Sequence, residues 1–203
     1  MSFYFYKGTN SIFRQSLMMQ CFFIAQLALL ACLLLFMSSA LATTQQHDEE
    51  RLFKAAFIYN FVKFTDWPDK TLTHNERKLA LCTLGKDLLI SDLKLLGGKT
   101  IKKQRVDIQE IRNLKQTTNC NILYIAQSEK HHYRKFLAET TNKPILTISE
   151  INDFSSTGGI VELYQEKGRT RFIINLELAR NAGLSISSRL LILARVIDSE
   201  TKH

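Results

Sequence analysis

Residues 79–98, LALCTLGKDLLISDLKLLGG, decide the fold class of this chain. The first six residues form a short apolar run that ends at Gly85, which is typical of a buried strand. Apolar residues then recur at helical spacing until Gly97-Gly98, at Leu88, Leu89, Leu93 and Leu96. The segment therefore predicts a strand followed by a helix, the unit from which α/β folds are built.

The chain that follows continues this alternation. Residues 105–111 (RVDIQEI) and 120–126 (CNILYIA) read as strands, and apolar residues at 133–137 indicate a helix. Residues 145–149 (ILTIS), directly after Pro144, read as another buried strand. We therefore expect several strands separated by helical crossovers, which is typical of parallel pairing.

The C-terminal third departs from this pattern with an antiparallel pair. Residues 160–165 (IVELYQ) and 169–175 (RTRFIIN) are joined across 166–168 (EKG), which predicts a β-hairpin. Alternating strands and helices together with one hairpin predict a single-domain, three-layer α/β sandwich. In it, helices flank a mixed, mostly parallel β-sheet.

Two helices are predicted after the hairpin. Asn175 and Glu177 start the first, which is closed by Gly183, and Ser187 or Ser188 caps the second. The second helix is expected to pack through a core stripe of Leu190, Leu193, Ala194 and Ile197.

Residues 48–65 predict a helix with a wide apolar face that Asp66-Trp67-Pro68 terminates. Two apolar stripes run along it, Phe53, Phe57, Phe61 and Phe64 in one and Leu52, Ala56, Tyr59 and Val62 in the other. Because this face is wider than one sheet needs, we predict a partner or dimer surface made by Tyr59, Phe61, Phe64 and Trp67. The alternative is that these four side chains pack in the core.

The N-terminal segment predicts export. Residues 21–37 are apolar except for Gln26, basic residues precede them, and Ala40-Leu41-Ala42 matches an A-x-A cleavage site. Residues 1–42 therefore read as a signal peptide, and residues 43–203 as the exported mature domain. An uncleaved membrane anchor is the alternative, because the apolar run is close to the length that spans a bilayer.

Composition supports a packed globular protein with a basic surface. Of 203 residues, 45% are hydrophobic and 23% are charged, which excludes disordered and fibrous classes. The formal charge of +8 falls to +6 without residues 1–42, because that segment holds two basic residues and no acidic one. In an exported protein this excess does not point to nucleic acid. Anionic lipid, lipopolysaccharide, an acidic protein face or plain solvation account for it.

Two cysteines, Cys82 and Cys120, remain in the mature chain. In an oxidising compartment, a single pair indicates one disulfide between two predicted strands. Two buried free thiols are the alternative.

No pattern in the chain assigns catalysis, a metal or a cofactor. The glycine fingerprint of dinucleotide binding fails after Gly85, where Asp87 and Ile90 replace the required glycines. A P-loop fails because Leu93 stands at the first glycine position. His131-His132 has no partner at ligand spacing, so a metal site is not indicated. We predict that the protein is not an enzyme.

Three segments together resemble the YfiR family of periplasmic proteins, which includes the HmsC relatives. They are KAAFIYNFVKFTDWP at 54–68, LCTLG at 81–85 with CNILYI at 120–125, and GGIVELYQEKGRTRFIINLELARNAGLSISSRLLILARV at 158–196. The last segment is the most specific, since Gly158-Gly159, Asn175 and Ser187-Ser188 follow the family pattern in order.

The resemblance implies a dimeric α/β protein that binds the periplasmic sensor domain of an inner-membrane diguanylate cyclase and represses it. Lower cyclic di-GMP and less biofilm would follow. Cys82 and Cys120 match the disulfide pair of the family. A second pair found in some relatives is missing, because residues 145–157 contain no cysteine, and any redox response that needs it is in doubt.

A binding module of another class is the alternative. It would be a periplasmic sensor of a small ligand that works with a histidine kinase or an outer-membrane receptor. Its pocket is expected near the carboxyl ends of the parallel strands.

Overall fold

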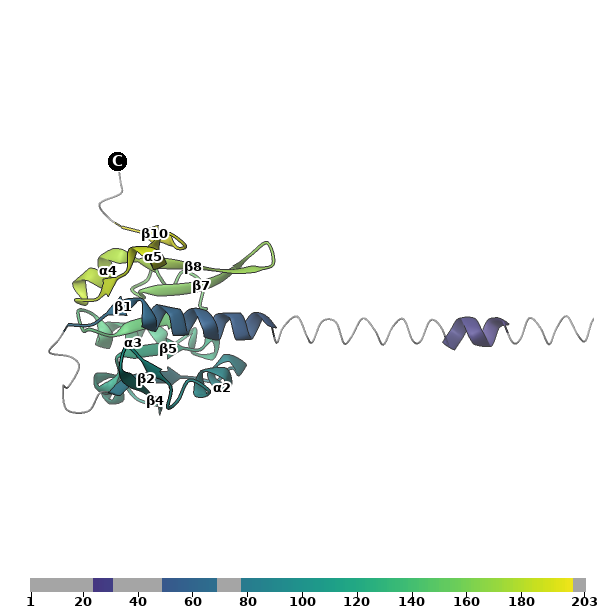
Figure 1. Cartoon of the computed structure of the whole chain (residues 1–203), viewed down its shortest axis with the longest axis horizontal. Coiled ribbons are helices and arrows are strands. Elements are labelled where there is room, and N and C mark those ends of the chain that lie inside the picture. The colour runs from purple at the N-terminus through teal and green to yellow at the C-terminus, as the bar shows by residue number, and fades with distance from the viewer. Residues whose placement is uncertain (1–23, 31–48, 69–77, 199–203) are drawn as a thin grey trace, which may run out of the picture. The chain divides into compact units, whose positions relative to one another are not determined.

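The computed structural model describes residues 24–30, 49–68 and 78–198 (Figure 1). The chain divides into two compact units, residues 1–48 and residues 49–203. Residues 24–30, the described part of the first unit, form a helix with exposed side chains. The predicted cleavage site lies outside the described residues. All elements below belong to the second unit.

A mixed β-sheet forms the centre of this unit. Among the described residues its order is β10 (Arg195–Ile197), β8 (Arg169–Asn175), β7 (Val161–Glu166), β6 (Leu146–Ser149), β5 (Ile122–Ile125), β2 (Lys78–Leu84), β4 (Gln104–Ile111) and β3 (Thr100–Ile101). Neighbours are parallel except in the pairs β7–β8 and β3–β4. The prediction of a mixed, mostly parallel sheet flanked by helices is confirmed. A separate antiparallel pair joins β1 (Thr65–Asp66) to β9 (Ser185–Ile186).

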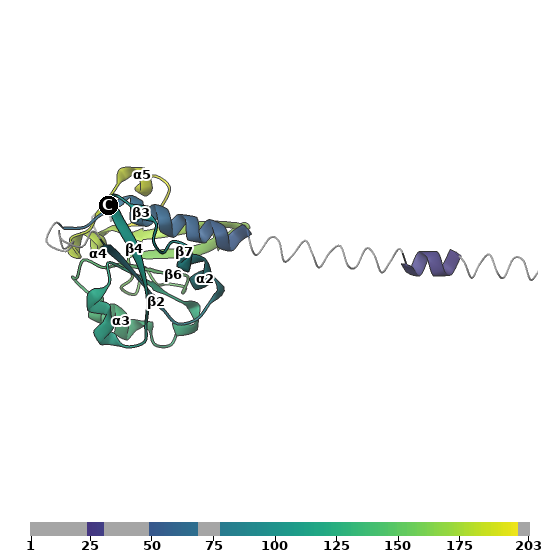
Figure 2. The ribbon, with the colours of Figure 1, turned by 60° about the horizontal axis from the view of Figure 1, so that its bottom comes forward.

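The two faces of the sheet are covered differently (Figure 2). Face A is covered by the helix at 49–63, α2 (Leu88–Lys94), α4 (Leu176–Asn181) and α5 (Ser188–Leu191). Face B is covered by the 3-10 helix η1 (Leu114–Asn119), by α3 (Tyr133–Thr140) and by the loop at 150–159. A second 3-10 helix, η2 (Gln127–Glu129), connects β5 to α3.

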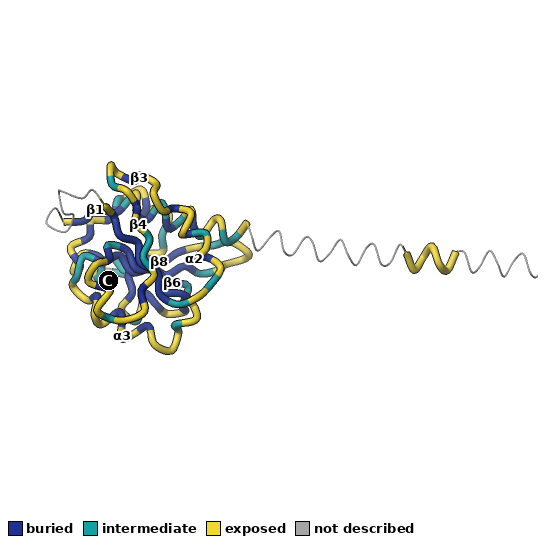
Figure 3. Tube along the Cα trace, turned by 90° about the horizontal axis from the view of Figure 1, so that it is seen from below, coloured by how far each residue is buried: buried dark blue, intermediate teal, exposed yellow. Residues whose placement is uncertain are grey.

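Side chains of each central strand alternate between the two faces, as the pleat requires. In β2, Leu79 and Leu81 join the core of face A, whereas Cys82 and Leu84 join the core of face B. Both sets are buried, which explains why the strand reads as a continuous apolar run. Figure 3 shows this burial concentrated along the central strands.

The hairpin was predicted correctly because its turn signal is local. β7 and β8 are joined by Lys167 and Gly168, with φ angles of 50° and 72°. Two consecutive positive φ angles are typical of a type I′ turn, whose twist matches that of paired strands.

The prediction of a final helix with a four-residue core stripe is wrong. α5 ends at Leu191, Leu193 is 64% exposed, and residues 195–197 form the edge strand β10. Parallel pairing places Val196 beside Ile174 of β8. This long-range pairing overrides the local helical spacing.

The burial predicted for the start of the first helix is also wrong. The helix covers residues 49–63 and buries Ala55, Ile58, Phe61 and Val62 against face A. Leu52 and Phe53 instead remain 55% and 63% exposed. The buried stripe is therefore narrower at the N-terminal end than the apolar sequence suggests.

Candidate functional site

A cavity of about 610 Å³ lies where β2 and β4 end. The register of the sheet places Leu84 beside both Ile111 of β4 and Ile125 of β5, so the carboxyl ends of three parallel strands meet at one edge. We call this hollow the carboxyl-end cavity; it is lined by Leu84, Gly85, Lys86, Glu110, Ile111, Arg112, Ser128, Glu129, His132, Lys135 and Phe136.

The wall between β2 and β5 is fixed by a close approach at Gly85. Its φ angle is +88°, and a Cβ built there would lie 2.6 Å from Ser128 Oγ. The backbone N–H of Lys86 donates to the same oxygen at 2.9 Å. Glycine is therefore required at this position both by the backbone angle and by the space.

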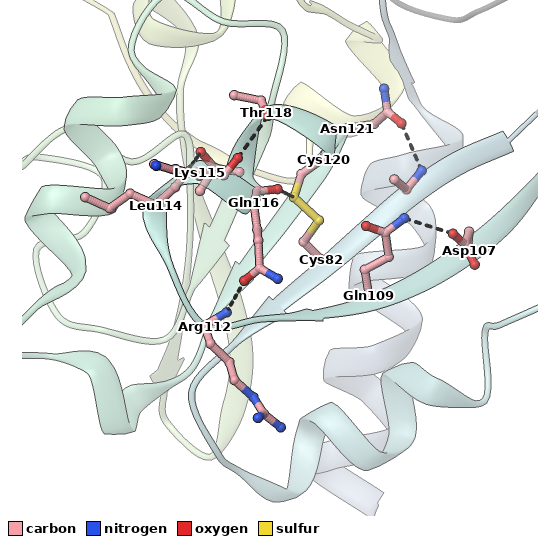
Figure 4. Close-up of a disulfide and its surroundings, with 12 residues drawn as sticks. Cys82, Asp107, Gln109, Arg112, Leu114, Lys115, Gln116, Thr118, Cys120 and Asn121 are labelled. Atoms are coloured by element: carbon pink, nitrogen blue, oxygen red, sulfur yellow. Dashed lines mark hydrogen bonds between the residues drawn. A yellow bond between two sulfur atoms is a disulfide. The ribbon is translucent and has the colours of Figure 1, made fainter.

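The disulfide lies on face B, and its Cys82 precedes the cavity-lining Leu84 by two residues on β2 (Figure 4). Cys82 of β2 and Cys120, which follows η1, are joined with their Cα atoms 5.7 Å apart. Both are buried, at 0% and 4% exposure. The bond therefore attaches the end of η1 to the centre of the sheet, in the pairing that the sequence indicated.

A capping box holds the start of η1 next to Arg112. The side chain of Asn113 accepts from the backbone N–H of Gln116, and Gln116 Oε1 accepts from the N–H groups of Arg112 and Asn113. Figure 4 shows Gln116 pointing back toward Arg112. The loop that carries Arg112 to the cavity is thus fixed by hydrogen bonds at one end and by the disulfide at the other.

The four residues predicted for a partner surface lie on or near face A. Phe61 is 0% and Trp67 8% exposed, while Tyr59 and Phe64 are half-buried. Phe61 packs edge-on against Phe172 with ring centroids 4.9 Å apart, and Trp67 Nε1 donates to the backbone oxygen of Asn121. In this structure Phe61 and Trp67 serve the core, which was the alternative use. The partner role remains a prediction, and only Tyr59 and Phe64 present surface for it.

On face A, a buried tyrosine connects the sheet to α2. Tyr124 donates to Asp87 Oδ2 at 2.6 Å, and Asp87 Oδ1 caps α2 by accepting from the N–H of Ile90. Burial raises the pKa of Tyr124, and the negative charges of Asp87 and Glu150 raise it further.

A lysine connects the first helix to the loop after β6. Lys54 Nζ lies 2.8 Å from Glu150 Oε2 and 2.6 Å from Glu50 Oε1. Partial burial lowers the pKa of Lys54, but the hydrogen bonds and charges of Glu150 and Glu50 raise it more, so the net shift is upward.

Basic residues gather at an edge of the sheet. Lys102 and Lys103 form the turn between β3 and β4, and Lys102 pairs with Asp66 at 2.5 Å. Charged side chains on an edge strand discourage pairing with other chains.

Metal-ligating side chains do not gather in the part of the chain that the structure describes. No three His, Cys, Asp or Glu residues there are placed to hold an ion. His131 and His132 are exposed in the turn before α3. Within the same residues, no helix has both the length and the apolar character needed to span a bilayer.

Comparison with known proteins gives one family and a distant structural likeness. The model of a family described as YfiR/HmsC-like matches residues 52–195. No curated protein matches the chain. Among solved structures, the ABC domain in complex with L-Trp from Streptococcus pneumonia is similar, with 13% identity and a TM-score of 0.47. The likeness covers 68% of this chain and spans 61% of that chain.

Proposed function

The chain belongs to the YfiR/HmsC-like family, and on this premise we propose that it represses an inner-membrane diguanylate cyclase by binding its periplasmic sensor domain. Membership supports a periplasmic regulatory protein of cyclic di-GMP signalling. The further steps, binding to the sensor domain and repression, are our proposal. The protein itself would carry out no reaction, because the cyclase makes the cyclic di-GMP.

The observation that carries this proposal is the extent of the family match. It runs from the first helix, at residue 52, to residue 195 at the start of β10. The match therefore includes both faces of the sheet, the disulfide and the carboxyl-end cavity. The regulatory role is accordingly assigned to the folded unit as a whole.

Repression would act by shifting a population. The bound regulator would favour a sensor geometry in which the cyclase cannot signal. Moving such an equilibrium from mostly active to mostly inactive requires about 5.5 kcal/mol of differential binding. An ordinary protein interface supplies this amount.

Exposed apolar side chains suggest where the sensor domain would bind. Leu52 and Phe53 on the first helix, Leu88 on α2 and Leu95, which directly follows α2, are all more than half exposed. An ion pair between Arg51 and Asp92 joins the two helices, and Leu88, Asp92 and Leu95 share one helical face. We call Leu52, Phe53, Leu88 and Leu95 the helix patch, and we propose it as the contact surface, extended by Tyr59 and Phe64. The ion pair holds the N-terminal end of the first helix to α2, and an exposed apolar patch is typical of an interaction site.

Location and assembly complete the proposal. Residues 1–42 would act as a cleaved signal peptide that delivers residues 43–203 to the periplasm. There the protein would form a homodimer and bind the cyclase, without nucleic acid or a cofactor. A sensor kinase is the alternative partner.

The first experiment compares intracellular cyclic di-GMP in a strain without this gene and in its parent. We expect a rise in the deletion strain that a plasmid copy of the full gene reverses. A copy lacking residues 1–42 should not reverse it, because the protein would stay in the cytoplasm. An unchanged level, in cells shown to make the protein, would overturn the proposal.

The helix patch is tested by Phe53→Asp. We expect cyclic di-GMP to rise to the level of the deletion strain while the amount of protein is unchanged, because a charge would be buried at the interface. Leu193→Asp is the matched control, since Leu193 is 64% exposed but lies outside the patch. Equal effects of the two variants would exclude the patch as the contact surface.

A further inference from the structure

The carboxyl-end cavity occupies the position at which α/β sheets hold their ligands. After β2 the chain turns through Gly85 toward α2 on face A, whereas after β5 it turns through η2 toward α3 on face B. β2 and β5 are neighbours in the sheet. Where adjacent parallel strands connect to opposite faces, a crevice opens outside their carboxyl ends, and ligands bind there.

Size and lining fit a small molecule with an apolar part. The volume of about 610 Å³ lies within the range of ordinary ligand pockets. Leu84, Ile111 and Phe136 contribute apolar side chains to the lining, and all three are almost fully buried. The other contributors are mostly charged, so the cavity combines an apolar floor with a polar rim.

Positive charge predominates on the rim. Lys86, Arg112 and Lys135 line the cavity together with two carboxylates, Glu110 and Glu129. Glu110 lies 3.7 Å from Arg112 Nη2, and its other oxygen lies 3.9 Å from Lys94 outside the cavity. Glu110 therefore already has cationic neighbours.

The second carboxylate of the rim, Glu129, has a histidine beside it, so the two lysines of the rim have no carboxylate partner among the described residues. Glu129 lies 4.0 Å from His132 Nδ1. Among the described residues, neither Lys86 nor Lys135 forms an ion pair. Lys135 Nζ lies 5.5 Å from the ring centre of Phe136, which places an ammonium group beside the apolar floor. Ammonium and guanidinium groups bind carboxylates and phosphates with short, strong hydrogen bonds.

We propose that the carboxyl-end cavity binds a small organic anion, a molecule with an apolar body and a carboxylate or phosphate group. Lys86 and Lys135 bind the anionic group, with Arg112 beside them, and Leu84, Ile111 and Phe136 cover the apolar body. The walls are set in advance, because Gly85 and Ser128 fix one side and the η1 cap fixes the other. This inference is independent of the cyclase partner proposed above.

Four benzene derivatives that differ in charge test whether the cavity prefers anions. Phenyl phosphate, benzoate, benzyl alcohol and benzylamine are titrated by calorimetry into protein purified from cells that express the full gene. We expect the two anions to bind at least about tenfold more tightly than the neutral and cationic probes. Equal binding of all four, or no binding of either anion at millimolar concentration, would overturn the proposal.

A pair of double variants tests the site. Lys86→Ala with Lys135→Ala should weaken anion binding by at least about tenfold. Lys99→Ala with Lys115→Ala removes the same charge from exposed positions outside the cavity and should leave binding within about twofold of the parent. Thermal unfolding confirms that each variant is folded. Equal losses in both would mean that only the net charge attracts the anions. Cyclic di-GMP is not a readout here, so failure leaves the regulatory proposal standing.

Discussion

Face A and face B of the same sheet are held in different ways. Face A is covered by four helices, and its core contains the fully buried Ile58, Phe61 and Leu93. Face B has the smaller core, and its cover consists of one α-helix, one 3-10 helix and a loop. Face B also contains the disulfide and a buried carboxylate. Where less apolar area covers a sheet, covalent and polar connections take over part of the stabilisation.

The carboxylate on face B is Glu162 of β7. Its two oxygens accept from the backbone N–H groups of Asp153 and Ser155 and from Ser155 Oγ, at 2.6–3.2 Å. The loop at 150–159 is therefore held to the sheet through one charged side chain. A comparable buried carboxylate is not found in the core of face A among the described residues.

The largest expected loss of stability comes from removing a buried aromatic ring from the core of face A. Phe61→Ala should lower the free energy of unfolding by about 3–5 kcal/mol, because a fully buried ring leaves a cavity against Phe172. Denaturant unfolding measures the loss. Phe53→Ala, on the exposed side of the same helix, should cost less than about 0.5 kcal/mol. Similar losses in both variants would contradict the assignment of Phe61 to the core.

Removing the disulfide tests face B. Cys82→Ala with Cys120→Ala should cost about 2–4 kcal/mol. Hydrogen exchange should accelerate in η1 and α3 while amides of α4 on face A keep their protection, because the bond fixes η1. In cells the variant should be less abundant, and cyclic di-GMP should rise. Uniform loss of protection on both faces would show that the faces are not distinct in stability.

Neutralising the buried carboxylate comes next. Glu162→Gln should cost about 1–3 kcal/mol, because an amide NH2 would replace an acceptor among hydrogen-bond donors. Proteolysis should then cut first within residues 150–159. Glu166→Gln, on the exposed end of the same strand, is the matched control and should be neutral. Resistance to proteolysis equal to the parent would argue against the anchoring role of Glu162.

The smallest effect concerns the polar connection on face A. Tyr124→Phe removes the hydrogen bond to Asp87 and should cost about 1 kcal/mol at neutral pH. The pKa of Tyr124 is raised above its ordinary value of 10.0, so the folded state keeps a proton that the unfolded state releases. The stabilisation that protonated Tyr124 gives the folded state is therefore complete below pH 10.0 and is lost as the pH rises above that value.

The pH dependence gives the control for this last variant. When the free energy of unfolding is measured from neutral to alkaline pH, it should fall less in Tyr124→Phe than in the parent. Tyr164→Phe, on a half-buried position of β7, should keep the parental loss. If the free energy of unfolding falls equally at alkaline pH in all three proteins, Tyr124 is not the cause of the decrease.

Sequence reasoning succeeded where the signal was local. The apolar run and Gly85 indicated β2, the EKG turn indicated the hairpin, and Asn175 caps α4 by accepting from the N–H of Leu178. It failed in the segment after Ser187, where helical spacing competed with pairing to β8. The 3-10 helix at Leu114–Asn119 was not predicted, although Asn113 followed three residues later by Gln116 is a capping signal.

The candidate site was predictable in position but not in composition. Parallel strands alone place a crevice at their carboxyl ends. Its basic side chains, Lys86, Arg112 and Lys135, come from three separate segments, and no motif in the sequence connects them. The aromatic residues of the first helix were also ambiguous, because periodicity identifies an apolar face without saying what covers it.

The sequence by itself determined the alternation of the longer strands and helices from β2 to α4, the hairpin and the family, since turn residues, caps and periodicity act over a few neighbouring positions. Only the tertiary structure decided which face each side chain joins, that Phe53 is exposed while Phe61 is buried, and that residues 195–197 form a strand. These outcomes depend on contacts between segments far apart in the chain. Their free energy exceeds the local preferences of any single segment.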